Sequence, residues 1–165
     1  MFIKKGIIFA ATLFASTIVL TACGNSDDSA SSANEGTTEE STSAELQDGT
    51  YSLKETNFDE NGWRVLFDLT VSDGKITESD YDYEDADGNL KSENEEYQKN
   101  MSEKVGVGPA DYIPQLNGEL EEKQDPSEVD AVSGATHSSE SFIKYANQLV
   151  DAAKEGNTDP IEVSN

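Results

Sequence analysis

The strongest constraint on the fold is a stretch in which apolar and polar residues alternate and which ends in a turn signal. Its odd-numbered positions carry large apolar residues (Trp63, Val65, Phe67, Leu69 and Val71), and the positions between them are polar apart from Leu66. This period of two predicts a strand with one face toward a core and the other toward water. Asp73-Gly74 follows directly and is typical of a two-residue hairpin turn. We therefore expect residues 75–83 to return as an antiparallel strand.

Turn residues mark the other boundaries of this predicted sheet. The segment DGTYSLKE at residues 48–55 predicts a first strand, so a folded core is expected to begin near Asp48. Asp87-Gly88-Asn89 predicts the turn that follows the returning strand. The first half of the core is therefore expected to be a small antiparallel sheet.

After residue 90 the apolar spacing changes to that of helices. Apolar residues recur at helical spacing in three segments: Tyr97, Met101 and Val105, then Tyr112, Ile113, Leu116 and Leu120, then Phe142, Tyr145, Ala146, Leu149, Val150 and Ala153. They predict an amphipathic helix over 92–104, a second helix around 112–120 and a third over 138–154. Gly106 is expected to end the first of these helices.

Strands early in the chain and helices late in it define an α+β fold class, with a small antiparallel sheet packed against helices around one core. We expect a single domain over residues 48–155. Residues 156–165 are predicted to form a loose polar C-terminal end.

The first 22 residues are typical of an exported bacterial protein. Lys4 and Lys5 precede an apolar run, residues 7–20, that is short for a transmembrane helix. The sequence Leu20-Thr21-Ala22-Cys23 resembles the lipobox of bacterial lipoproteins. Residues 1–22 are therefore predicted to be a lipoprotein signal peptide, with Cys23 as the lipidation site and the extracellular face of the cell membrane as the location. The alternative is an ordinary secretory signal with a chance cysteine.

Between Cys23 and the core the chain is almost free of apolar residues. Residues 23–47 therefore predict a flexible acidic tether, rich in Ser and Thr, between the lipid bilayer and the domain. The whole chain carries a formal net charge of −23, with 34 acidic and 11 basic residues. Because nucleic-acid binding depends on Lys and Arg that neutralise phosphates, no nucleic-acid partner is expected.

The acidic residues and the single histidine predict no metal site. The acid-rich segment 80–89 suggests a calcium loop, but the first and twelfth ligand positions would be Tyr83 and Asn94 instead of acids. A solvated acidic hairpin is the preferred interpretation. His137 is the only histidine and Cys23 the only cysteine, so a zinc site built from these residue types is excluded.

The most distinctive polar motif is Asp130-Ala-Val-Ser133-Gly134-Ala135-Thr136. Gly134 permits backbone conformations that other residues avoid, and the free N–H groups at a helix start favour an anion. One interpretation is a displayed threonine beside a site for a phosphate, just before the third helix. The alternative is a plain N-cap, in which the hydroxyl serves only the helix.

The same residues resemble a known family. Asp130, Ser133, Gly134, Ala135 and Thr136 match the D-x-x-[ST]-G-A-T signature of the FMN-binding domain. That domain occurs in the C subunit of the sodium-pumping NADH:quinone reductase, the G subunit of the Rnf complex, and flavinylated lipoproteins of extracellular electron transfer. The segments DGTY and VSDGKIT and the helix after the motif also resemble the family's layout, over about residues 48–155.

The resemblance implies a covalent flavin. A partner flavin transferase that uses FAD and Mg²⁺ would move FMN onto the Thr136 hydroxyl as a phosphoester and release AMP. Asp130, Ser133, Gly134 and Ala135 would form its recognition sequence, and one motif implies one covalent FMN per chain. His137 is expected to be exposed. By residue type alone, Trp63, Tyr83 and Tyr112 are candidates to contact the flavin ring, although core roles are preferred for each.

The implied function is an electron carrier rather than an enzyme. A membrane-anchored domain would relay electrons from a membrane dehydrogenase or quinol pool to extracellular acceptors, and its acidic surface would suit cationic ones. The alternative is a non-redox surface binding lipoprotein. The apolar piece of the signal peptide at residues 13–22 is in addition a candidate peptide pheromone. An enzyme with its own substrate is the weakest alternative, because no general acid or substrate pocket can be named.

Overall fold

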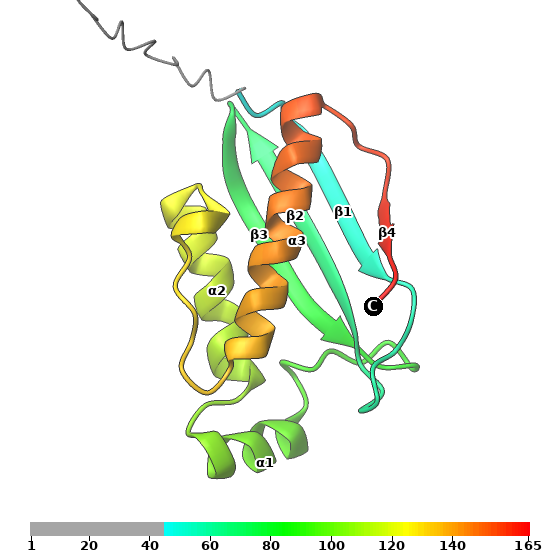
Figure 1. The fold of residues 1–165 in the computed structure, drawn as a ribbon, viewed down its shortest axis with the longest axis vertical. Helices are drawn as coiled ribbons and strands as arrows, with labels where there is room; N and C mark the ends of the chain where they lie inside the picture. The colour runs from blue at the N-terminus through cyan, green and yellow to red at the C-terminus, as the bar shows by residue number, and fades with distance from the viewer. Residues whose placement is uncertain (1–44) are drawn as a thin grey trace, which may run out of the picture. The chain divides into compact units, whose positions relative to one another are not determined.

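The computed structural model describes residues 45–165 and shows an α+β fold in which helices cover one face of a four-stranded sheet (Figure 1). The predicted signal peptide, Cys23 and most of the predicted tether lie outside the described residues. The strands are β1 (Gly49–Glu55), β2 (Arg64–Ser72), β3 (Lys75–Glu84) and β4 (Ile161–Val163). The helices are α1 (Glu95–Val105), α2 (Pro109–Lys123), the short 3-10 helix η1 (Pro126–Glu128) and α3 (Thr136–Glu155).

The predicted antiparallel core of the sheet is confirmed. β1 pairs with β2, and β2 with β3, both antiparallel. The turn between β2 and β3 is the predicted Asp73-Gly74 pair, which has positive φ at both residues, 52° and 71°. Along β2 the odd-numbered residues are buried and Leu66 lies half-buried on the other face, as the alternation requires.

The sheet contains a fourth strand that the sequence analysis placed in a loose end. Residues 161–163 form β4, which pairs in parallel with β1, so the strand order is β3-β2-β1-β4 and the sheet is mixed. The prediction of a loose end at 156–165 is therefore wrong. Three residues are too few to display a period of two, and this strand is defined by its partner β1 and not by its own pattern.

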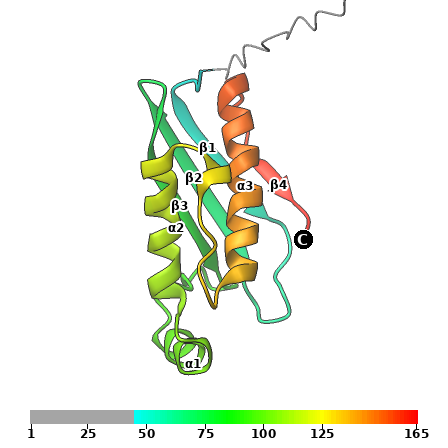
Figure 2. The same ribbon diagram turned by 60° about the vertical axis from the view of Figure 1, so that its left-hand side comes forward.

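Both long helices pack on the same face of the sheet, as the two views show (Figures 1 and 2). α2 lies over β3, and α3 crosses β1 and β2. An aromatic cluster joins α3 to the sheet: the ring centroids of Phe67 in β2, Tyr81 in β3 and Phe142 in α3 lie 5.1–5.2 Å apart. This packing fixes the start of α3 against the end of β3.

The helix boundaries differ from the predicted ones for local reasons. α1 begins at Glu95, because the Asn94 side chain accepts a hydrogen bond from Tyr97 N and caps the helix there. It ends at Gly106, as predicted, with φ 84°. α3 begins two residues earlier than expected, at Thr136.

The domain also begins slightly before Asp48. Gln47 N donates a hydrogen bond of 2.9 Å to Ala153 O, and Leu46 packs against the core. The last residues of the predicted tether therefore belong to the folded domain and join it to the end of α3.

Candidate functional site

The turn before α3 depends on Gly134. This glycine has φ +86°, and a Cβ atom there would lie 2.8 Å from the carbonyl oxygen of Val105 and 2.9 Å from Cγ1 of Val107. Any other residue would combine a strained backbone with a clash against the last residue of α1 and the segment that joins α1 to α2. The turn is therefore packed closely against that segment.

Thr136 is the first residue of α3 and is exposed. The N-cap position belongs to Ala135, and no side chain caps the helix. The expectation that Thr136 lies just before the helix is thus wrong by one residue. The alternative in which Thr136 caps the helix is contradicted too, because its hydroxyl lies one position too late to accept from the N–H groups of the first turn.

The start of α3 has free donors beside Thr136. The first hydrogen bond across this helix runs from Ser139 N to Ala135 O, at 2.9 Å. The N–H groups of Thr136, His137 and Ser138 precede it and have no partner within the helix. No acidic residue occupies the first turn. These donors and the helix dipole make the space beside the Thr136 hydroxyl favourable for an anion.

A buried serine that the sequence analysis missed holds this turn in place. Ser139 is 0% exposed, and its Oγ accepts from Val132 N and donates to Ala135 O, both at 3.0 Å. The hydroxyl therefore ties both sides of the Gly134 turn to the first turn of α3. Ser139 lies three residues after Thr136, on the face of α3 that carries the apolar residues, and that position could have identified it as a buried polar residue.

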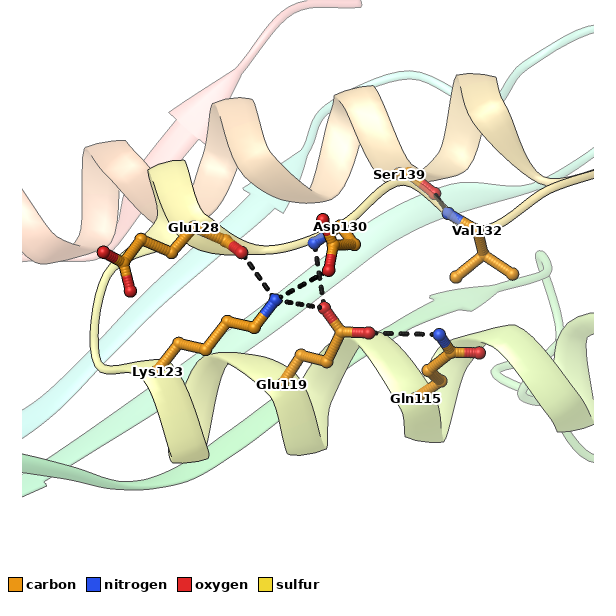
Figure 3. A network of polar contacts seen from close by, with 7 residues as sticks. All are labelled: Gln115, Glu119, Lys123, Glu128, Asp130, Val132 and Ser139. Carbon is orange, nitrogen blue, oxygen red and sulfur yellow. Dashed lines mark hydrogen bonds and ion pairs between the residues drawn. The ribbon is translucent and has the colours of Figure 1, made fainter.

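Asp130 is held at the start of the motif by an ion-pair network (Figure 3). Lys123 Nζ lies 2.9 Å from its carboxylate, 3.2 Å from Glu119 and 2.6 Å from the carbonyl oxygen of Glu128. Glu119 in turn accepts a hydrogen bond of 2.8 Å from Asp130 N. The hydrogen bond to Asp130 is the largest cause that raises the pKa of Lys123. Asp130 is nevertheless 84% exposed, so its carboxylate is both fixed and accessible.

The remaining motif residues divide between surface and core. Ser133 and Gly134 are exposed, whereas Ala135 is 3% exposed and packs in the core. His137 is exposed, as expected. The structure thus places Ser133 and Gly134 in the turn, Asp130 three residues before it and Thr136 at the start of α3, with the polar residues exposed.

The three aromatic residues named as ring contacts lie in the core. Trp63, Tyr83 and Tyr112 are each 8% exposed or less. Tyr83 and Tyr112 belong to a group of hydroxyls beneath the start of α3. In that group Tyr81 Oη donates to Tyr83 Oη at 2.7 Å, and Ser138 Oγ donates to Tyr112 Oη at 3.3 Å. Burial raises the pKa of Tyr81, Tyr83 and Tyr112, and their hydroxyls therefore stay neutral at physiological pH.

The acid-rich segment 80–89 is not wholly solvated. Asp82 is 4% exposed and accepts hydrogen bonds from Tyr83 N and from Ser92, so the expectation of a solvated hairpin is wrong at this position. Burial raises the pKa of the Asp82 carboxyl.

Within residues 45–165 no group of three metal-ligating side chains is found. No helix in the same part of the chain is long and apolar enough to cross a membrane.

Comparison with known proteins identifies the class. The model of the FMN-binding domain family matches residues 62–151, more than half of the chain, and this protein belongs to that family.

Two relatives are similar over most of the chain. A protein named "15 kDa lipoprotein" from Treponema pallidum (strain Nichols) is 36% identical over 116 residues, which cover 70% of this chain and 82% of that protein. The crystal structure of the CPE2226 protein from Clostridium perfringens superposes with a TM-score of 0.69 at 37% identity. The superposition covers 73% of this chain and 98% of the CPE2226 chain.

The residues of the turn fit an FMN phosphate. Thr136 offers an exposed hydroxyl, and the N–H groups of the first turn lie beside it without partners in the helix. Gly134 adds no side chain of its own two residues before that hydroxyl, and Thr136 is exposed. Thr136 would carry the phosphate and the helix start would stabilise its charge. The flavin ring would supply the redox chemistry.

Proposed function

We propose that this protein is a one-flavin electron carrier, with FMN esterified through its phosphate to the Thr136 hydroxyl. The observation that carries the proposal is the exposed, uncapped threonine at the first position of α3, in a turn that Gly134 and Ser139 hold rigid. A rigid, accessible hydroxyl suits modification by a separate enzyme, because the acceptor needs no rearrangement. Membership of the FMN-binding domain family supports FMN as the group attached.

The partner enzyme in this proposal is a flavin transferase that uses FAD and Mg²⁺. It would join the FMN phosphorus to Thr136 Oγ1, break the bond between the two phosphates of FAD and release AMP. Asp130 and Ser133 are the polar side chains that such an enzyme would meet beside the acceptor, since both are exposed. Ala135 is buried, so its role would be to shape the turn.

The cellular setting is part of the same proposal. Lipidation at Cys23 would anchor the chain in the membrane at its extracellular face, and the naming of the Treponema pallidum relative as a lipoprotein supports this. A membrane dehydrogenase or quinol pool would supply electrons, and extracellular acceptors would take them. The function is therefore that of a carrier, without a substrate of its own. A pheromone role for residues 13–22 lies outside the described part of the chain.

The test is intact mass and visible absorption after incubation with a flavin transferase, FAD and Mg²⁺. We expect the unchanged protein to turn yellow and to gain the mass of one FMN group. Thr136→Val should stay colourless, because it keeps the shape of threonine without the hydroxyl. Thr158→Val, an exposed threonine near the other end of α3, is the matched control and should be labelled fully. Equal labelling of Thr136→Val would refute the proposal.

A further inference from the structure

α1 carries an apolar stripe that its own domain buries only in part, since Tyr97 and Met101 pack against the edge of the core. Tyr97, Met101 and Val105 follow one another at helical spacing, which the sequence analysis took as the sign of an amphipathic helix. In the structure Tyr97 and Met101 are half-buried, Val105 is 49% exposed, and no residue of α1 is fully buried. The stripe therefore leaves apolar surface available at the end of the molecule where α3 begins (Figure 1).

The stripe runs from the Gly134 turn, just before Thr136, to a hollow. The stripe ends at Val105, whose carbonyl oxygen lies 2.8 Å from the point that a Cβ atom on residue 134 would occupy. Met101 lies four residues before Val105, about 6 Å along α1, and Tyr97 eight residues before it, about 12 Å. Met101 and Tyr97 line an open hollow of about 320 Å³, together with Asn61, Asn100 and Lys104. That volume is near the lower end of the usual range for small-molecule sites.

The chemistry of the hollow suits a flat, amphipathic ring. Tyr97 and Met101 supply an aromatic and a polarisable apolar surface, while two asparagines and a lysine supply hydrogen-bonding groups. A larger hollow of about 660 Å³ is lined in part by Asn147. Asn147 lies eleven residues after Thr136 on α3, roughly 16 Å along the helix axis, which is less suited to a group attached at Thr136.

A buried lysine lies behind Tyr97. Lys91 is 6% exposed, and its ammonium lies 4.5 Å from the ring centroid of Tyr97, 4.3 Å from that of Tyr83 and 5.6 Å from that of Trp63. Within residues 45–165 this ammonium forms no salt bridge, although the carboxylates of Asp59 and Asp82 act on it from farther away. Burial lowers the pKa of Lys91, and those two carboxylates oppose the change.

We propose that the flavin ring of an FMN attached to Thr136 lies in this hollow, against Tyr97 and Met101 of α1. The inference rests on the proposed function, which supplies the covalent link, and adds the site of the ring. The Lys91 ammonium, which lies against the Tyr97 ring, would then place a positive charge near the flavin ring. Reduction of the flavin by two electrons and one proton from the quinol or dehydrogenase donor leaves a negative charge on the ring, and the Lys91 ammonium would stabilise it.

Met101 provides a direct test, because the only other methionine is Met1, outside the described residues. The methyl group of methionine is isotope-labelled in the full chain, and NMR spectra are compared before and after attachment of FMN. We expect the Met101 methyl resonance to shift in the field of the ring and to show Overhauser contacts with flavin protons. If mass spectrometry shows FMN on Thr136 but the Met101 resonance does not shift, the ring site is overturned while the proposed function stands. A chain that takes up no FMN would overturn the proposed function as well.

The second measurement is the reduction potential of the attached flavin. Lys91→Met keeps the aliphatic stem among the aromatic rings but removes the charge, so the potential should become more negative. Lys99→Met, an exposed lysine of α1, is the matched control and should leave the potential unchanged. Equal potentials in the two variants would contradict the role of Lys91. A purely structural role for this lysine would change stability and not the potential.

Discussion

Ser139 contributes nothing to the molecular surface, yet its hydroxyl fixes the backbone that presents Thr136. Val132 N–H and Ala135 C=O lie on opposite sides of the Gly134 turn, and Ser139 Oγ bonds to both. The geometry of the acceptor site is therefore set by a residue that follows it in α3. Such a hydroxyl is costly to remove, because it leaves a buried N–H group without a partner.

Ser139→Ala should lower the free energy of unfolding by about 1–3 kcal/mol, the cost of leaving Val132 N–H unsatisfied. The measurement is urea denaturation followed by the fluorescence of Trp63, which is the only tryptophan and is buried. Ser133→Ala removes an exposed hydroxyl from the same turn and should change stability by less than about 0.5 kcal/mol. Equal unfolding midpoints for the two variants would show that Ser139 does not hold the turn.

At the scale of elements, β4 covers the outer edge of β1 with its three residues. Its backbone pairs with β1, and Thr56 N donates to Val163 O at 2.8 Å. The residues after it also contact the core, since Asn165 donates to the buried Glu55 carboxylate at 3.2 Å. Tyr145 from α3 donates to the same carboxylate. The C-terminal segment thus joins the sheet edge to the helix layer.

Deletion of residues 161–165 should lower stability by roughly 1–3 kcal/mol, since it leaves part of the hydrogen-bonding potential of Glu55 unmet. It should also expose the edge of β1, and an unpaired edge strand promotes association between chains. Urea denaturation measures the first effect, and size-exclusion chromatography over a range of concentrations measures the second. Glu162→Ala keeps the backbone of β4 and is the control. A deleted chain that is monomeric and as stable as this control would contradict the prediction.

The same elements show what the sequence can predict. β2 and α3 are long enough for their apolar residues to repeat several times, so their type and buried face follow from spacing. β4 is too short to repeat, and its position depends on β1, which lies more than 100 residues earlier. At the site, the small residues Gly134 and Ala135 before Thr136 were enough to predict the turn from the sequence. The roles of Ser139 and Lys91 could not be predicted in this way, because they depend on the residues that surround these two buried side chains in the fold.

At the scale of the whole molecule, buried tyrosine hydroxyls link stability to pH. Burial is the largest cause that raises the pKa of Tyr81, Tyr83, Tyr112 and Tyr145. The unfolded chain loses these protons near pH 10, its ordinary tyrosine value, while the folded protein retains them. The stabilisation from these groups is thus fully present below about pH 10 and is lost as the pH rises from there through the folded values. Lys91, with its lowered pKa, acts in the opposite direction but is a single group.

Stability should therefore fall above about pH 10 by up to ~1.4 kcal/mol per pH unit for each buried tyrosine. The urea midpoint is measured by Trp63 fluorescence from about pH 8 to about pH 11, and tyrosinate absorbance is followed in parallel. Ionisation of the buried tyrosines should coincide with unfolding instead of preceding it. Tyr112→Phe should reduce the slope, because one retained proton is removed from the folded state. Tyrosinate absorbance that rises fully while Trp63 remains buried would contradict this coupling, since it would mean that the folded core accepts the charge.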